Sequence, residues 1–361
     1  SSPLGNAGSH RVYRLPTILK GMETSHTTDR PTYRGSKLNV GRIHIAVVAY
    51  RFGSFLLRRI PYSLLKPIQR FSASIAAKSS KERRLLVGRH LSRVYGEMIP
   101  PKELDKKIHQ TFETYARYWV DSARIPRLSD FEIDSGFTVE GFEHIENAMA
   151  TGIGPILALP HLGGWEWAGR WLICCPKYQV SVVVEEQSPP ELFQFLMKYR
   201  QDFGMNVIPL GPNAGKQVIK ALKANHVVCL LCDRDIEGNG IEVNFFGEKT
   251  TVPAGPATLA LRTGAHIVPV AVYQQERSHH AVVCPPITAQ RSGRLRDNIS
   301  EITQELVHVF EDLIRAAPEQ WHLMQPNWES DHLAIEKFQL ETSDKTNEPE
   351  DPPLAFDMDY Q

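Results

Sequence analysis

Residues 155–166 read PILALPHLGGWE, and this stretch decides the fold. It opens with a short apolar run of the kind that forms a strand buried on both faces of a parallel sheet. Pro160 ends the run, His161 follows at once, and two glycines permit a tight turn into a helix that carries Glu166. Ligands bind at the carboxyl ends of the strands in such sheets, so His161 lies where a functional side chain is expected.

The same alternation of strand and helix continues along the rest of the chain. Beyond the strand at 155–160, the expected strands are 179–185, 206–210, 227–233, 266–273 and 280–284. The helices expected between and after them are 164–173, 189–203, 214–224, 254–263 and 295–315. Upstream, apolar residues at helical spacing predict helices at 43–59, 63–77, 81–95 and 103–123. We therefore predict an α/β fold whose largely parallel central sheet is flanked by helices, with amphipathic helices on its N-terminal side.

The charged residues are unevenly distributed along the chain. Its 361 residues hold 41 Lys and Arg against 41 Asp and Glu, and a net charge of zero argues against a general nucleic-acid-binding protein. Residues 41–95, however, hold twelve basic side chains and one acid, a net charge of +11, whereas residues 329–361 hold ten acids and two lysines, a net charge of −8. We expect residues 1–40 to be a disordered extension, residues 41–328 the folded domain and residues 329–361 an acidic disordered tail.

The apolar segments do not predict a membrane span. The most apolar stretch, residues 43–57, is shorter than the roughly 20 residues that a span needs, and polar side chains interrupt it. The first 40 residues lack the apolar centre of a signal peptide, which favours the cytoplasmic side. Met22 is an alternative start, so whether residues 1–21 belong to the native protein stays open.

The cysteines and the paired histidines do not predict a metal site. Five cysteines, an odd number, fit a reducing compartment better than a disulfide framework. Cys229 and Cys232 form a C-x-x-C, but on a strand they point to opposite faces and are expected to be buried structural residues. His279 and His280 lack a third ligand at a plausible spacing. In the glycine-rich GPNAGKQ stretch, Gln217 stands where a nucleotide-hydrolysing P-loop needs Ser or Thr.

His161 and Glu166 are the strongest candidates for chemistry. A histidine at the carboxyl end of a strand is placed to act as a general base, and a nearby carboxylate can fix its tautomer. No serine or cysteine lies in a G-x-S-x-G elbow, which favours direct transfer to an acceptor hydroxyl over a covalent intermediate. The alternative is a packed or capping histidine at a strand-to-helix turn.

Four blocks of the sequence together resemble a known family. The H-x4-E in PHLGGWEWAG is similar to the signature of the glycerolipid and lysophospholipid acyltransferases. The later runs CDRDIE (232–237), VNFFGE (243–248) and PAGPATLA (253–260) resemble the bacterial lipid A biosynthesis acyltransferase family, in its branch of phosphatidylinositol mannoside acyltransferases. The resemblance covers roughly residues 41–330, so the domain at 41–328 is expected to be an acyltransferase domain.

The resemblance implies a reaction and the roles of several residues. It implies transfer of a fatty acyl group, palmitoyl, from acyl-CoA to a mannose hydroxyl of a phosphatidylinositol mannoside, without a cofactor or a metal. His161 would be the base and Glu166 the signature carboxylate. Glu237, after DRD, would be the partner of the histidine, with Asp235 as the alternative. The family is peripheral, on the cytoplasmic face of the plasma membrane.

Four further residues are candidates for substrate binding. Arg200 and Arg234 suit the phosphates of coenzyme A or of the lipid, although a structural ion pair is the alternative for each. Glu185, at a strand end, is placed to contact sugar hydroxyls or to cap the next helix. Glu242, just before the FFG block, is the fourth candidate.

The basic segment 41–95 has two interpretations. Its apolar and basic side chains suit helices lying on an anionic membrane, and they also suit helices packed on the core with a solvated basic face. The acyltransferase motifs downstream favour the membrane. Two other functions stay open: a lipid A-type acyltransferase that uses acyl-acyl carrier protein, and a membrane-associated lipid-binding protein without catalysis.

Overall fold

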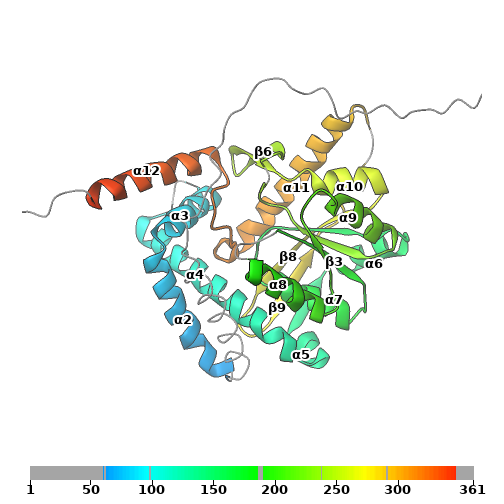
Figure 1. Cartoon of the computed structure of the whole chain (residues 1–361), viewed down its shortest axis with the longest axis horizontal. Helices are drawn as coiled ribbons and strands as arrows, with labels where there is room; N and C mark the ends of the chain where they lie inside the picture. Colours follow the sequence, from blue (N-terminus) through cyan, green and yellow to red (C-terminus); the bar gives the residue numbers. More distant parts are fainter. Residues whose placement is uncertain are drawn as a thin grey trace, which may run out of the picture.

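A seven-stranded sheet forms the centre of the computed structural model, which describes residues 60, 62–96, 99–185, 190–236, 238–289 and 292–346 (Figure 1). Its strands are β1 (Phe137–Glu140), β2 (Ile156–Leu159), β3 (Val180–Val184), β4 (Asn206–Pro209), β5 (Val227–Leu231), β8 (Ile267–Gln274) and β9 (His279–Val283). They lie in the order β1-β9-β8-β2-β5-β3-β4, and every neighbouring pair is parallel except β8 and β9. The expected α/β fold with a largely parallel sheet is confirmed.

Helices make up most of the remaining chain. They are α2 (Tyr62–Ser79), α3 (Lys81–Tyr95), α4 (Pro101–Arg124), α5 (Asp130–Ser135), α6 (Glu143–Ala150), α7 (Trp165–Cys174), α8 (Pro190–Asp202), α9 (Ala214–Lys223), α10 (Gly255–Thr263), α11 (Leu295–Ala316) and α12 (Glu329–Thr346), with short 3-10 turns at Ile125–Arg127 and Pro318–Gln320. The helices expected between the strands are present and end within a few residues of their expected positions. β1, α5 and α6 were not predicted from the sequence.

The apolar strands bury both faces of the sheet. In β2, Ile156 and Ala158 belong to a core that includes α9, α10 and α11, whereas Leu157 and Leu159 belong to a second core that includes α6 and α7. Successive side chains of a strand point to opposite faces, so a continuous apolar run serves both cores. This double burial explains why β2 has no polar residue.

The N-terminal helices α2, α3 and α4 form a third packed group beside the sheet (Figure 1). Its core comes from all three helices and includes Ala73, Ala77, Val87, Leu91, Ile108 and Phe112. Another face of α2 carries four large apolar side chains that are exposed: Leu64, Ile68, Phe71 and Ile75. Their spacing of three and four residues aligns them along one stripe of the helix. We call them the α2 stripe.

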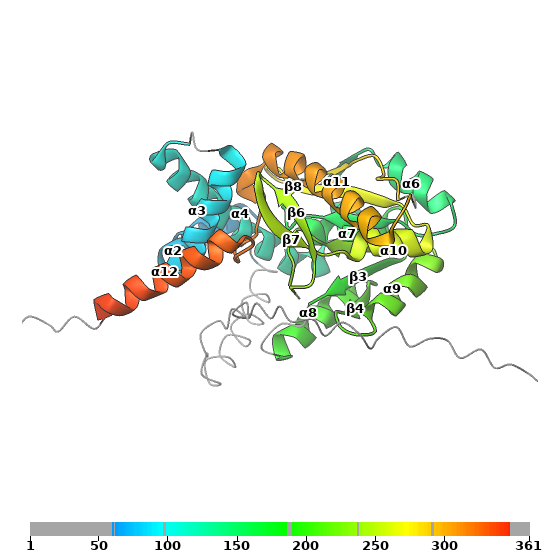
Figure 2. The same ribbon diagram turned by 90° about the horizontal axis from the view of Figure 1, so that it is seen from above.

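A two-stranded hairpin that the sequence did not predict lies against α11 (Figure 2). It consists of β6 (Ile241–Phe245) and β7 (Glu248–Val252), which pair antiparallel. The FFG block forms its turn, where Phe246 and Gly247 both have positive φ, 51° and 77°. Phe245 is fully buried, so the hairpin is packed into the body of the protein.

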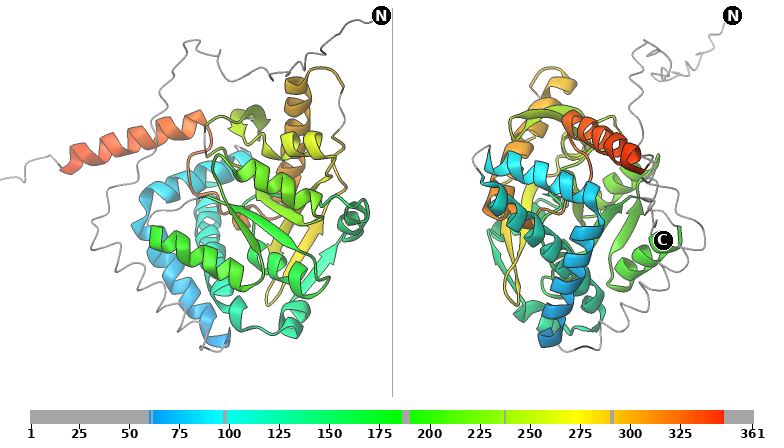
Figure 3. Two further views of the ribbon diagram at one scale, coloured as in Figure 1. Left: turned by 45° about the vertical axis from the view of Figure 1, so that its right-hand side comes forward. Right: turned by 90° about the vertical axis from the view of Figure 1, so that its left-hand side faces the viewer.

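The C-terminal acidic segment corrects an expectation. Residues 329–346 form α12, which projects away from the sheet (Figure 3), and they are not part of a disordered tail. Asp331 in its first turn is fully buried. Its carboxylate accepts hydrogen bonds from Arg89 Nε at 2.7 Å and His90 Nε2 at 3.0 Å, and it lies 2.9 Å from Arg93 Nη2. The expected acidic tail would place Asp331 in solvent, whereas its buried carboxylate pairs with basic residues of α3.

No helix among the described residues has both the length and the apolar character needed to cross a bilayer. The expected extension at 1–40 and the helix expected at 43–59 lie outside the described residues, as does the rest of the acidic tail, 347–361.

Candidate active site

The candidate site lies where three neighbouring parallel strands end. β2, β5 and β3 are adjacent and parallel, so their carboxyl ends lie side by side. His161 follows β2, Asp233 and Arg234 follow β5, and Glu185 follows β3. The sheet therefore brings together three residues that the sequence singled out and a fourth, Asp233, from the DRD block.

A short hydrogen bond joins His161 to Asp233. His161 Nδ1 lies 2.5 Å from Asp233 Oδ1, and the backbone N–H of His161 donates to Oδ2 at 3.0 Å. An ionised carboxylate only accepts, so Nδ1 carries the proton and Nε2 of the neutral imidazole keeps its lone pair. Nε2 has no hydrogen-bond partner within the described part of the chain, and the side chain is 24% exposed. The site thus presents an accessible base in a fixed tautomer.

Asp233 is fully buried, yet its surroundings favour the ionised form. Trp321 Nε1 donates to its Oδ2 at 2.8 Å, and Asn327 Nδ2 donates to its backbone carbonyl at 3.3 Å. Burial alone would raise the pKa of Asp233, but the charge of His161 and the hydrogen bonds from His161 and Trp321 hold that pKa below its usual value. The carboxylate can therefore stabilise an imidazolium at His161.

The turn between His161 and α7 leaves no room for a side chain at Gly163. This residue has a φ of +64°, and a Cβ there would lie 1.8 Å from the carbonyl oxygen of Val272. The Gly163 N–H donates to the Gln320 carbonyl at 2.9 Å, and the His322 N–H donates to the His161 carbonyl at 2.7 Å. The chain segment around residue 321 is therefore bound directly to the turn that carries the base.

Glu166 pairs with an arginine and does not contact His161. Its side chain is 5% exposed, and Arg200 of α8 donates to its Oε1 through Nε at 3.0 Å and through Nη2. Burial would lower the pKa of Arg200, but the charge of Glu166 raises it, so the guanidinium keeps its proton. No hydrogen bond or ion pair joins Glu166 to His161 among the described residues. The carboxylate of the H-x4-E block holds α7 to α8.

The other candidate binding residues divide between two places. Arg234 Nη2 donates to Glu185 Oε2 at 2.9 Å, beside the His161–Asp233 pair, and the Glu185 side chain is 38% exposed. Arg234 Nε is buried and has no hydrogen-bond partner among the described residues. Glu242 pairs with Lys249 at 2.8 Å on the exposed side of the hairpin.

The acids that follow Asp233 do not compete for His161 within the described residues. Asp235 accepts hydrogen bonds from the backbone N–H groups of Gly238 at 2.9 Å and Gly240 at 2.8 Å, so it closes its own turn. Glu237 lies outside the described residues. Asp233 is therefore the described acid that contacts the histidine.

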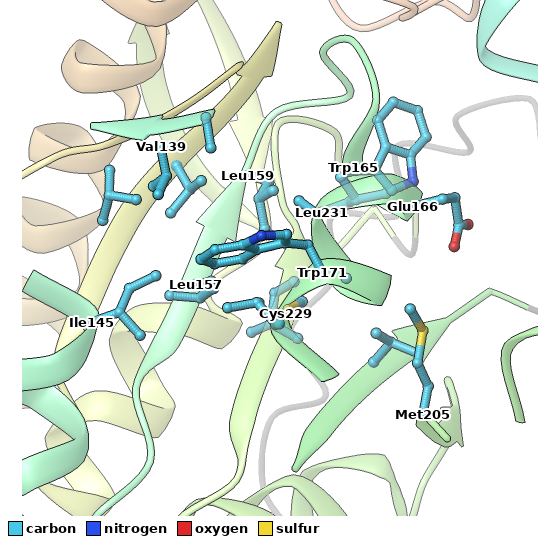
Figure 4. Close-up of a pocket in the computed structure, with 18 of the residues that line it drawn as sticks. Val139, Ile145, Leu157, Leu159, Trp165, Glu166, Trp171, Met205, Cys229 and Leu231 are labelled. Carbon is cyan, nitrogen blue, oxygen red and sulfur yellow. The ribbon is translucent and has the colours of Figure 1, made fainter. Parts of the chain in front are cut away.

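An apolar cavity opens beside the site, between the sheet and α7 (Figure 4). It has about 780 Å³ of space free of protein atoms, part of it open to solvent. Trp165 and Glu166 lie at one end, Ile145 lies at the other, and Trp171 lies between them (Figure 4). Among its described lining residues only Glu166 and Arg200 are charged.

Trp165 connects this cavity to the base. Its ring meets the imidazole of His161 edge to face, with centroids 5.8 Å apart, and it also lines the cavity. Tyr118 packs on the other side of the indole, with centroids 4.2 Å apart. A chain lying in the cavity would therefore end close to His161.

Within the described residues, no group of three or more His, Cys, Asp or Glu is arranged to hold a metal ion. Cys229 and Cys232 are free thiols. Burial raises the pKa of Cys229 to about 12, and burial followed by the charge of Asp233 raises that of Cys232. These thiols are packing residues, as the sequence predicts.

Two residues of the site, Asp233 and Trp321, were not predicted from the sequence. Asp233 directly follows an apolar strand, which is the same signal that singled out His161, but as part of DRD it was treated only as a marker of the block. Trp321 lies in no motif, and its contact with Asp233 depends on the packing of segments far apart in the chain.

Comparisons with known proteins agree with the sequence blocks. A family model described as Bacterial lipid A biosynthesis acyltransferase matches residues 35–330. A phosphatidylinositol mannoside acyltransferase of Mycobacterium tuberculosis is 33% identical over 299 residues, which are 81% of this chain and 91% of the relative. One of Mycolicibacterium smegmatis is 34% identical over 289 residues, or 79% and 91%. The crystal structure of a 1-acyl-sn-glycerophosphate acyltransferase from Thermotoga maritima matches with 13% identity and a TM-score of 0.32, covering 68% of this chain and 97% of that one.

Proposed function

Because the chain belongs to the bacterial lipid A biosynthesis acyltransferase family, we propose that it transfers a fatty acyl group from acyl-CoA to a mannose hydroxyl of a phosphatidylinositol mannoside. That it is an acyltransferase of lipid biosynthesis follows from the family. The mannoside acceptor is proposed from the names of two relatives. The observation that carries the proposal is the His161–Asp233 pair beside the end of an apolar cavity.

His161 is the proposed general base. Its Nε2 takes the proton of the acceptor hydroxyl while that oxygen attacks the thioester carbonyl carbon, and Asp233 stabilises the imidazolium that forms. The tetrahedral intermediate then expels the coenzyme A thiolate, which takes the proton from His161, so the base is restored. The backbone N–H groups of Trp165 and Glu166, at the start of α7, have no backbone partner among the described residues, and they are the proposed donors to the oxyanion.

The apolar cavity is the proposed site of the acyl chain, palmitoyl. Its lining is apolar except for Glu166 and Arg200, and small-molecule sites are usually apolar with a few polar groups. Each methylene removed from water contributes about 0.8 kcal/mol, so burying a long chain supplies binding energy and places the thioester near His161.

The ion pair Arg234–Glu185 is the proposed contact for the acceptor headgroup. It lies at the neighbouring strand ends and is partly exposed, and the buried Nε of Arg234 has hydrogen-bonding capacity that no described residue uses. A guanidinium can bind a phosphate, and a carboxylate can accept hydrogen bonds from sugar hydroxyls. These two chemistries together fit a phosphorylated mannoside.

The protein is proposed to act as a peripheral protein on the cytoplasmic face of an anionic plasma membrane. The α2 stripe supports this, because exposed Leu, Ile and Phe side chains flanked by Lys66, Arg70 and Lys78 match a helix lying in the headgroup region. Each basic residue near such a surface contributes about 1 kcal/mol.

One assay separates the proposed reaction from its alternatives. The purified chain is incubated with labelled palmitoyl-CoA, or with labelled acyl-acyl carrier protein, and with a phosphatidylinositol mannoside or a lipid A precursor. We expect label from palmitoyl-CoA on the mannoside. Label only on the lipid A precursor would replace the proposal with a lipid A-type reaction, and no transfer by folded protein that binds vesicles would favour a lipid-binding protein.

The membrane contact is tested with matched variants. Phe71→Ser, at a position that is 70% exposed in the α2 stripe, is expected to weaken binding to anionic vesicles about 30-fold, because it removes about 2 kcal/mol of apolar burial. Phe131→Ser on α5, at a position that is 80% exposed, is the control and should leave binding unchanged. An equal loss of vesicle binding in Phe71→Ser and Phe131→Ser would show that the α2 stripe has no specific role in it.

A further inference from the structure

We propose that Trp321 is a positioning residue for acyl transfer: its indole N–H holds the Asp233 carboxylate in line with His161, and the FFG block acts on the reaction by holding Trp321. The inference rests on the proposed function, because it concerns the same base. Trp321 does not touch the proposed substrates, so its effect passes through Asp233.

Three N–H groups donate to the carboxylate of Asp233, one to Oδ1 and two to Oδ2. Oδ1 accepts from His161 Nδ1 at 2.5 Å, and Oδ2 accepts from Trp321 Nε1 at 2.8 Å and from the His161 backbone N–H at 3.0 Å. The indole is 3% exposed, so water does not replace it readily. An isolated β-bridge between Leu162 and Trp321 also fixes the tryptophan backbone next to the base. Loss of the indole N–H would leave the buried carboxylate short of a donor and freer to rotate.

The FFG block packs around this indole. The rings of Phe245 and Phe246 lie with their centroids 5.8 Å from that of Trp321, and Trp328 lies 6.3 Å away, edge to face. The hairpin turn directs both phenylalanines to the same cluster, and Glu311 fixes the turn by accepting the Phe246 N–H at 2.5 Å. The FFG block has no chemically reactive group, but its rings pack on Trp321, which donates to Asp233 beside His161.

Two elements outside the sheet complete the support. The ring of His90 on α3 lies 5.5 Å from Trp321 and 5.3 Å from Trp328. Its ring nitrogens face the Leu323 carbonyl at 2.9 Å and the carboxylate of Asp331 on α12 at 3.0 Å. The indole of Trp321 is therefore held from the hairpin, from α3 and from the start of α12.

The test compares two substitutions in the same buried cluster. Trp321→Phe removes the donor to Asp233, whereas Trp328→Phe removes an equally buried indole whose N–H donates to the Phe245 carbonyl at 3.3 Å. We expect Trp321→Phe to lower kcat about tenfold, the size of a hydrogen bond to a charged group, with KM for palmitoyl-CoA and for the mannoside nearly unchanged. The acid limb of its kcat/KM profile should move to higher pH, because a carboxylate that has lost a donor makes proton uptake by the His161–Asp233 pair easier.

Trp328→Phe should lower stability and leave the pH profile in place. An equal displacement of the profile in both variants, or a wild-type kcat and profile in Trp321→Phe, would overturn the inference. If the wild-type chain transfers no acyl group at all, the proposed function has failed, and the measurement described below still tests the contact itself.

The charged groups near the pair and its support are Arg234 and Glu185 beside the pair, Asp331 against His90, and Arg93 against Trp328. Three further titratable groups lie there as well. Burial, followed by the charge of His161, lowers the pKa of His322 to about 3, and burial raises the pKa of the Cys232 thiol, so neither changes charge near neutral pH. His90 contacts both tryptophans. If His90 caused the displacement of the pH profile, both variants would show it. If the His161–Asp233 pair causes it, Trp321→Phe alone will show it.

A second measurement needs no change at Trp321. The chain has six tryptophans, and their indole N–H groups are labelled with ¹⁵N. The measurement uses Trp165→Phe, because this substitution removes the indole that lies against His161. One remaining indole N–H signal should then lie downfield and move with pH as the His161–Asp233 pair takes up a proton. If none of the remaining indole signals moves, Trp321 does not hold the carboxylate and the inference is wrong.

Discussion

Two carboxylates at the ends of neighbouring elements have opposite surroundings. Asp233 holds a partly exposed histidine, whereas Glu166 is bound by Arg200 and has no contact with that histidine among the described residues. Both carboxylates are buried. The partner of Asp233 is an imidazole, which can accept and release a proton, whereas the partner of Glu166 is a guanidinium, which keeps its proton.

The difference teaches that spacing in a motif does not establish a contact. Glu166 enters the first turn of α7, which packs on α8, so its side chain meets Arg200. Asp233 lies at the end of the strand next to that of His161, and a parallel neighbour brings the two together whatever their separation in sequence. These contacts support the proposal that the His161–Asp233 pair transfers the proton and that the Glu166–Arg200 pair is structural.

The largest expected effect is that of His161→Ala. Loss of a general base typically costs 10²- to 10⁴-fold, and we expect kcat to fall by about 10³-fold. The fold should persist, because the imidazole is partly exposed. Steady-state assays with labelled palmitoyl-CoA, together with circular dichroism of the same samples, make the measurement. Turnover near that of the wild type would show that another residue is the base.

Asp233→Asn should have the next largest effect. We expect kcat to fall about 10²-fold, because an amide cannot stabilise the imidazolium by charge. The acid limb of the pH profile should move to lower pH, opposite to the shift expected for Trp321→Phe, since a protonated His161 loses its counter-ion. The wild-type contribution of Asp233 to stability is present above its unfolded pKa of about 4 and is lost as pH falls through its lowered folded pKa. Urea unfolding should therefore show a smaller difference between wild type and variant at low pH than at pH 7.

Glu166→Gln is expected to act mainly on stability. It leaves the buried guanidinium of Arg200 without a counter-ion, and we expect the free energy of unfolding to fall by about 3 kcal/mol. kcat should fall less than in Asp233→Asn. Replacing both partners, Glu166→Met with Arg200→Leu, should recover much of the loss in urea unfolding. A fall in kcat as large as that of Asp233→Asn, with an unchanged free energy of unfolding, would contradict the assignment of this pair as structural.

Glu185→Gln should have the smallest effect. The pair with Arg234 is partly exposed, so we expect the free energy of unfolding to change by less than about 0.5 kcal/mol. KM for the mannoside should rise about threefold while KM for palmitoyl-CoA stays constant, as for loss of one hydrogen bond. Glu242→Gln on the hairpin is the matched control. A rise in KM for the mannoside in the control alone would move the acceptor site to the hairpin.

The strands of the main sheet after β1, and the position of His161 at the end of one of them, could be predicted because they depend on local patterns. The apolar run before His161 required burial on both faces, and the glycines after it required a tight turn; both appear in the structure. The position of Glu185 at the end of a strand followed from the same reasoning.

The partner of His161 and the C-terminal helix could not be predicted in the same way. The order β2-β5-β3 decides that Asp233 faces His161, and strand order is a property of the whole sheet. Asp331 was counted as one acid in an acidic tail, although three basic groups of α3 surround it. Trp321 reaches Asp233 only because the hairpin, α3 and the start of α12 hold it there. Each of these contacts joins segments that are far apart in the sequence, so no local sequence pattern predicts it.

The most direct test of the central claim is the NMR signal of the His161 Nδ1 proton. A proton shared with a carboxylate at 2.5 Å gives a strongly downfield signal, and it depends on the acceptor oxygen. We predict that the signal is present in the wild type and in Glu166→Gln and is lost in Asp233→Asn. A signal that survives in Asp233→Asn and disappears in Glu166→Gln would contradict the account.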